Sequence, residues 1–170
     1  MEKNTARVLA IAVIIAVVVA AIAIFVFVID KEKYDYAEYT IGGSTTTGYT
    51  VEGSMKMELL DETSTQYKMR VTTEIYLIGG GTTVTIQNDQ VTRWEDKDPN
   101  DTYGTYQKTD TIGTNWGLKT VEIYRETNSD GYVDAYVSPS DGVLYKMVYV
   151  TVISGQTLTM TFTLTDTNLL

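Results

Sequence analysis

The sequence contains neither cysteine nor histidine, and only two of its 170 residues are proline. Without cysteine the chain has no disulfide, no thiolate metal site, no cysteine nucleophile and no lipid-modified cysteine. Without histidine it lacks the side chain whose ordinary pKa is nearest neutrality, which excludes the histidine-dependent serine and cysteine triads. We therefore expect a protein that is not an enzyme and that carries no cofactor.

Basic residues are also scarce. The 13 lysines and arginines face 22 aspartates and glutamates, for a formal net charge of −9. Two of the basic and one of the acidic residues precede residue 8, and residues 8–29 carry no charge, so residues 30–170 have a net charge of −10. An acidic domain repels phosphate backbones, and no basic patch with interleaved aromatic residues is present. Nucleic acid is not an expected partner.

The single long apolar run covers residues 8–29, without a charge, an amide, a proline or a glycine. As a helix these 22 residues would measure about 33 Å, which matches a hydrocarbon core of about 30 Å. The run follows a polar leader at residues 1–7 and is longer than the apolar region of a cleaved signal peptide. It is predicted to be an uncleaved transmembrane signal anchor, with the lipid bilayer as its partner.

The orientation of this anchor rests on weaker signals. Lys3 and Arg7 precede the run, and Lys31 and Lys33 follow it, so the positive-inside rule hardly separates the two orientations. The acidic, threonine- and tyrosine-rich remainder carries an Asn100-Asp101-Thr102 triplet of the kind glycosylated outside cells. We predict a single-pass protein of the cell membrane, with its N-terminus inside and its remaining residues outside.

The remaining residues alternate in polarity. Residues 30–48 are predicted to form a juxtamembrane segment and a first strand, with a loop at 42–48. The extracytoplasmic β domain then covers residues 49–170. Apolar side chains occupy every second position in 49–60 and again in 67–78, and six residues connect these segments. This pattern indicates two strands of an antiparallel hairpin, each with one dry face.

Further strands follow to the end of the chain, separated by turn sequences that include Asn128-Ser129-Asp130-Gly131. Residues 143–153 are apolar at both odd and even positions, which predicts a central strand covered on both faces. No apolar repeat of helical period occurs after residue 30. The prediction is an all-β fold: one transmembrane helix followed by a mostly meander antiparallel sheet of eight or nine strands, as a half-barrel or a sandwich.

One block resembles a known family. Lys119 to Tyr124, Tyr132 to Val137 and the turn and strand Pro139-Ser140-Asp141-Gly142-Val143-Leu144-Tyr145-Lys146-Met147 resemble the strand, strand and "D-x-x-T/S-G-L-x-x-K" hairpin of LolA-like and LppX-like lipoprotein carriers. The resemblance implies a half-open antiparallel barrel with an apolar concave face that binds lipid or lipoprotein. It covers roughly 35 residues. The chain differs from these carriers in having an apolar span where they have a lipidated cysteine or a cleaved signal.

Five of the six methionines lie on strand faces predicted to point inward. Flexible, polarizable methionine suits an adaptable apolar pocket, and it suits an ordinary core equally well. The candidate pocket residues are Met55, Met57, Met69, Met147 and Met160.

Two acidic segments match part of the ligand spacing of a calcium-binding loop. Asp96, Asp98 and Asn100 alternate as the first ligands of such a loop do, but Asp101 replaces the required glycine and no glutamate stands at the twelfth position. Asn128, Asp130 and Asp134 form a second group. Solvated turns are the favoured interpretation of both, so no metal is expected.

Two hypotheses for function remain. The first is a non-enzymatic module, anchored in the membrane and binding an apolar ligand or a cell-envelope partner. The alternative is a pilin-like or adhesive surface subunit, because an N-terminal apolar helix before a β-rich head is also typical of such subunits. The leader lacks the glycine that a prepilin peptidase requires, which favours the first hypothesis.

Overall fold

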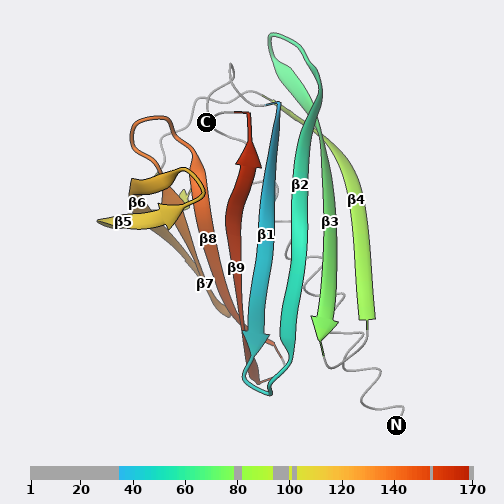
Figure 1. Cartoon of the computed structure of the whole chain (residues 1–170), viewed down its shortest axis with the longest axis vertical. Coiled ribbons are helices and arrows are strands. Elements are labelled where there is room, and N and C mark those ends of the chain that lie inside the picture. Colours follow the sequence, from blue (N-terminus) through green and yellow to red (C-terminus); the bar gives the residue numbers. More distant parts are fainter. Residues whose placement is uncertain (1–34, 79–81, 94–99, 101–102, 154, 169–170) are drawn as a thin grey trace.

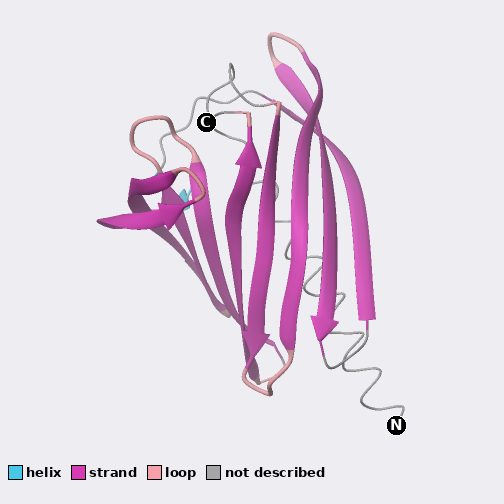
Figure 2. Cartoon of the chain, in the orientation of Figure 1, coloured by secondary structure: helices cyan, strands magenta, loops and turns pink. Residues whose placement is uncertain are grey.

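Nine antiparallel strands make up nearly all of the computed structural model (Figure 1), which describes residues 35–78, 82–93, 100, 103–153 and 155–168. Figure 2 shows that loops between the described strands are short and that no long helix occurs among the described residues. The all-β prediction is confirmed. The strands are β1 (Tyr36–Thr45), β2 (Thr50–Glu62), β3 (Gln66–Ile78), β4 (Thr82–Arg93), β5 (Thr105–Thr114), β6 (Gly117–Asn128), β7 (Gly131–Val137), β8 (Leu144–Ile153) and β9 (Gln156–Thr167).

All nine strands belong to one sheet, in the order β4-β3-β2-β1-β9-β8-β7-β6-β5. The sheet therefore consists of two meanders, β1–β4 and β5–β9, which are joined where the first and last strands pair. β4 and β5 follow one another in sequence but lie at opposite edges, so the sheet is not closed. The described strands form one sheet rather than two, which excludes the predicted sandwich for this part of the chain. The predicted anchor at 8–29 lies outside the described residues.

The pairing of β2 with β3 fixes which side chains share a face. Met57 lies opposite Val71, and the neighbouring Lys56 lies opposite Thr72. Because successive side chains of a strand point to opposite faces, the first pair belongs to the apolar face and the second to the polar one. The burial of β3 alternates along its whole length from residue 67 to residue 78, as the sequence predicts.

The β5–β6 hairpin crosses the end of the sheet at a steep angle to β8 and β9 (Figure 1). Its turn reaches back to the other end of this meander, where Asn115 Nδ2 donates to the main-chain oxygen of Thr165 in β9. The neighbouring Trp116 ring packs 6.3 Å from the ring of Tyr145 in β8, centroid to centroid. The sheet is thus curled at this end.

β1 extends through part of the predicted loop at 42–48. The strand continues to Thr45, with Gly43 opposite Val51 of β2 and Met160 of β9. A Cβ atom on Gly43 would lie 2.5 Å from the main-chain oxygen of Thr159. This glycine therefore permits close packing of neighbouring strands rather than a turn, which composition alone does not distinguish.

The prediction for residues 143–153 is also corrected. β8 is an interior strand, and Tyr145 and Met147 on its inner side are buried. On its other side Val148 and Val150 are only half-buried, and Val152 is 51% exposed. No second described layer covers that side, so apolar residues there lie partly in solvent.

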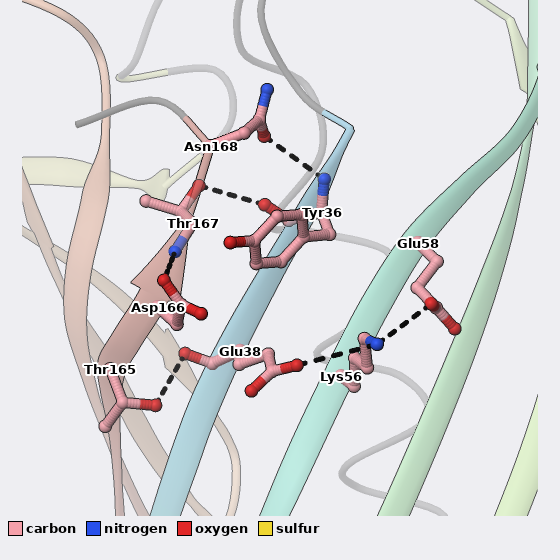
Figure 3. A network of polar contacts seen from close by, with 8 residues as sticks. All are labelled: Tyr36, Glu38, Lys56, Glu58, Thr165, Asp166, Thr167 and Asn168. Atoms are coloured by element: carbon pink, nitrogen blue, oxygen red, sulfur yellow. Dashed lines mark hydrogen bonds and ion pairs between the residues drawn. The ribbon is translucent and has the colours of Figure 1, made fainter.

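Hydrogen bonds and ion pairs connect β1 to β9 and β2 at the end of the sheet where β1 begins and β9 ends (Figure 3). Asn168 Oδ1 accepts hydrogen bonds from the main-chain nitrogens of Asp35 and Tyr36, and Thr167 Oγ1 donates to the main-chain oxygen of Tyr36. Lys56 lies between Glu38 and Glu58, with its Nζ 3.6 and 3.0 Å from their carboxylate oxygens. Partial burial, and then the Asp166 carboxylate, raise the pKa of the Tyr36 hydroxyl.

Candidate apolar binding face

All five candidate methionines are buried, with exposed fractions between 0 and 2%. They come from β2, β3, β8 and β9 and lie in one hydrophobic cluster. The register places Met57 opposite Ala37 and Met147 opposite Phe162. The structure therefore brings together residues that are up to 105 positions apart in sequence. Whether they bind a ligand remains a prediction.

These methionines belong to an apolar surface that we call the inner face. Its members share the side of the sheet to which Met57 points, and none carries a charge. Each member is at most 3% exposed. They are Ala37, Tyr39 and Ile41 of β1, Val51, Met55 and Met57 of β2, Tyr67, Met69, Val71, Thr73, Ile75 and Leu77 of β3, Met147 of β8, and Leu158, Met160, Phe162 and Leu164 of β9.

Tyr39 crosses the inner face. Its buried hydroxyl donates to the main-chain oxygen of Leu144, 2.9 Å away, although β9 lies between β1 and β8. A buried tyrosine hydroxyl needs such a partner to avoid a desolvation cost. Sequence reasoning did not select Tyr39. The available signal was the short alternation of Ala37, Tyr39 and Ile41 with polar neighbours.

Tyr145 brings a buried hydroxyl group into the cluster at the curled end of the sheet. Tyr145 is buried, and its hydroxyl has no hydrogen bond within 3.5 Å among the described residues. Burial raises the pKa of this hydroxyl, and the Asp141 charge acts in the same direction. The Lys119 ammonium group opposes both effects, and it lies 5.8 Å from the centre of the tyrosine ring.

The opposite side of the sheet, which we call the outer face, carries ion pairs instead. Arg125 of β6 donates two hydrogen bonds to Asp134 of β7, at 2.6 and 2.7 Å, and its guanidinium group lies 4.0 Å from the centre of the Tyr132 ring. Arg70 of β3 makes a similar forked contact with Asp89 of β4. Along most of β2 and all of β3 the charged side chains therefore lie on the outer face, which leaves the inner face of these strands suited to apolar contacts.

Neither proposed calcium loop forms a cluster of acidic ligands among the described residues. Asp96 and Asp98 lie outside those residues. Asn100 is exposed, and its main-chain oxygen accepts a hydrogen bond from Gly104. In the second group Asn128 Oδ1 accepts from the main-chain nitrogen of Asp130, while Asp134 is paired with an arginine.

The described part of the chain contains no helix with the length and apolar character needed to cross a bilayer. The transmembrane prediction concerns residues 8–29, which lie outside that part. Membrane insertion therefore remains a prediction from sequence.

No known family model and no curated protein sequence matches this chain. Among solved structures, the redesigned β-barrel mFAP0, bound to DFHBI, aligns with 74% of this chain and 94% of its own. The two sequences are 11% identical, and the TM-score is 0.29. A score at that level does not establish a shared fold.

Proposed function

We propose that this protein is a non-enzymatic binding module, held at the cell membrane by residues 8–29, whose inner face receives an apolar ligand. The observation that carries the proposal is the uncharged inner face on an open sheet. A single sheet needs a partner for its apolar side, because exposed apolar surface of that extent is unfavourable in water. A lipophilic ligand supplies such a partner.

The methionines support a ligand that varies in shape. Met55, Met57 and Met69 are neighbours across β2 and β3, since Met57 and Met55 lie opposite Val71 and Thr73 while Met69 lies opposite Leu59. Unbranched methionine side chains can repack around different apolar surfaces, whereas branched ones hold one shape. An acyl chain is the simplest ligand that meets these conditions. The same chemistry would bind the acyl group of a cell-envelope lipoprotein.

Photolabelling with a diazirine analogue of palmitate tests this proposal. The full chain is reconstituted into phosphatidylcholine vesicles, irradiated with the probe and mapped by mass spectrometry. We expect labelled peptides from β2 and β3, with labelling that unlabelled palmitate reduces by competition. Label confined to residues 8–29 or to the outer face would overturn the proposal.

Two matched variants sharpen the measurement. Met57→Gln keeps the side-chain length on the inner face but adds a polar group, whereas Lys56→Gln changes the neighbouring residue on the outer face. We expect weaker labelling of the first and unchanged labelling of the second, because only the inner face contacts the ligand. Thermal unfolding of both variants establishes that each retains the fold. Equal labelling of the two folded variants contradicts the proposal.

The alternative function, a pilin-like or adhesive surface subunit, is favoured by the two open edges of the sheet. β4 and β5 each pair with one neighbour only among the described strands, and such edges can add a strand from another chain. N-terminal sequencing of the mature protein separates the two functions. An intact leader supports the anchor, and an apolar first residue supports processing as in pilins.

A further inference from the structure

We propose that the edge strand β4 is a self-association surface, at which the β4 strands of two copies of this chain pair antiparallel across a two-fold axis. This contact goes beyond the proposed ligand site, because it uses an edge of the sheet rather than the inner face. It does not depend on what the inner face binds, so the two proposals can fail separately.

The first observation is an open edge of regular geometry (Figure 1). β4 pairs with β3 along its whole length without a register shift, and it has no other neighbour among the described strands. Alternate main-chain groups of a strand point to either side of it, so the outward N–H and C=O groups of β4 have no described strand as a partner. An unbulged edge of this kind can accept another strand.

The second observation is a contrast between the two edges. The register of β5 shifts between Tyr106 and Lys108, and an ion pair of Lys108 with Asp110 lies on this strand. Residues 83–88 of β4 read Thr-Val-Thr-Ile-Gln-Asn, without a charge, a proline or a glycine. Bulges and charges hinder strand addition, whereas uncharged segments rich in β-branched residues favour it. β4 is therefore the edge suited to association.

The third observation shows what an added strand must present. Val84 and Ile86 lie on the inner side of β4 and are only half-buried. Their partners in β3, Ile75 and Thr73, are each 2% exposed. A strand beyond β4 would cover Val84 and Ile86 if it carried apolar side chains at alternate positions. β4 itself has this pattern, which makes a second copy a matching partner.

Strand direction favours a second β4 over β5. Every neighbouring pair in the nine-stranded sheet is antiparallel, so β4 and β5, at its two edges, run in the same direction. Closing the sheet through these edges would need a parallel pair, which is the less stable kind. Two β4 strands related by a two-fold axis normal to the sheet are antiparallel, and both inner faces stay on one side. This symmetry also closes the assembly at two copies.

An axis through Thr85 matches the side chains of the two strands. It places Val84 of each copy opposite Ile86 of the other, and Thr83 opposite Gln87. Apolar pairs then lie on the inner side, and polar pairs lie on the outer side, where Thr83, Thr85 and Gln87 are exposed in the single chain. Both kinds of cross-strand pair are favourable.

Charge does not oppose this register. The paired segment, residues 82–88, contains no charged residue, although the whole chain has a formal net charge of −9. Asp89 lies just beyond the segment, and its carboxylate is 2.8 Å from the Arg70 guanidinium group of the same chain. Like charges therefore do not face one another across the axis.

Disulfide formation across the axis tests the pairing, and the chain offers no background because it has no cysteine. Thr85→Cys places a thiol on the axis, and Thr111→Cys places one at an exposed position of the other edge. The full chain of each variant is oxidised in detergent micelles under identical conditions. We expect the disulfide-linked dimer of Thr85→Cys to form at least about tenfold faster, because pairing raises the effective concentration of the two thiols. Equal rates would overturn the proposal.

Mixtures of single-cysteine variants test strand direction and register. Thr83→Cys and Gln87→Cys lie opposite one another in the proposed ladder. Their mixture should therefore give more heterodimer than random pairing of thiols gives. A parallel ladder in register would instead favour the two homodimers, and that result, or random pairing, contradicts the antiparallel contact.

Sedimentation equilibrium of the full chain tests association without a disulfide. Thr85→Lys places two ammonium groups opposite one another at the axis, whereas Thr111→Lys adds the same charge to β5. The dimer dissociation constant of Thr85→Lys should rise by about tenfold or more, because like charges directly opposite destabilise a strand pair. Thr111→Lys should match the parent chain, and thermal unfolding establishes that both variants retain the fold. A monomeric parent chain, or equal dissociation constants for the two variants, rules out the β4 contact.

Discussion

Asn115, in the turn between β5 and β6, donates a hydrogen bond from Nδ2 to the main-chain oxygen of Thr165 in β9, at a distance of 2.9 Å. β7 and β8 separate β6 from β9 in the sheet. The contact therefore holds the hairpin back across the meander and keeps this end of the sheet curled.

Replacing Asn115 by alanine should destabilise the hairpin by about 1 kcal/mol, the net value of one ordinary hydrogen bond. Amide hydrogen exchange should become faster in β5 and β6, while the amides of β1–β3 keep their rates. Thr111→Ala, at an exposed position of β5, serves as the control and should change neither the stability of the hairpin nor its amide exchange rates. Uniformly faster exchange across all strands would show that Asn115 does not act locally.

Phe162 should be among the most sensitive positions of the core. It is fully buried in β9, at the middle of the sheet, and lies opposite Ile41 and Met147. Phe162→Ala should lower the free energy of unfolding by about 3–5 kcal/mol, because the lost apolar contacts leave a cavity. Leu118→Ala, at a position 79% exposed, should change it by less than about 0.5 kcal/mol. Urea unfolding measures both, and similar values for the two variants would contradict this placement of the core.

Gly131 is required for strand packing rather than for a special turn conformation. A Cβ atom there would lie 1.9 Å from the main-chain oxygen of Val150 in β8, whereas one on Gly113 in β5 would meet nothing within 4 Å. Gly131→Ala should destabilise the protein by about 1–3 kcal/mol through forced strand displacement. Gly113→Ala should be neutral or slightly stabilising. Thermal unfolding compares the two, and equal melting temperatures would refute the steric argument.

Stability should depend on pH through the pair of Arg70 and Asp89 that joins β3 to the edge strand β4. Hydrogen bonds from Arg70 lower the pKa of the Asp89 carboxyl below its ordinary value of 3.8. The pair therefore contributes stability above that value, and the contribution is lost as the pH falls through the lower pKa of the folded state. Asp89→Asn should be less stable than the parent protein at pH 7.

The stability difference between the parent protein and Asp89→Asn should shrink below about pH 4, where the parent carboxyl begins to gain its proton. Urea unfolding midpoints of both proteins at pH 7 and at pH 3 measure this difference. Arg70→Gln removes the other partner and should show the same pH dependence, and 1 M salt should reduce the difference at pH 7. A stability difference that is equal at both pH values would show that it does not come from the Asp89 carboxylate.

Local alternation carries much of the information about the fold. The odd positions of 67–77 are buried, and those of 49–60 are buried or half-buried, because a strand with one wet face imposes a period of two. Glycines were less informative. Gly43 lies within β1, where it admits a neighbouring backbone, although the same residue in a glycine-rich stretch favoured a loop.

The candidate face was predictable only in part. Each methionine could be placed on the dry side of its own strand from its neighbours in sequence. Tyr39 could not be linked to Leu144 in this way, because the link depends on β9 lying between their strands. The role of Trp116 against Tyr145 likewise depends on how far the β5–β6 hairpin curls.

The sequence by itself determined the all-β class, the inward side of β2 and β3, and the segregation of charge from apolar residues, since these follow from the covalent alternation of a single strand. Only the tertiary structure decided that β1 pairs with β9, that one sheet forms instead of two, and that β4 and β5 remain open edges. Strand order joins residues far apart in sequence, and it is set by how whole strands pack together rather than by any local pattern.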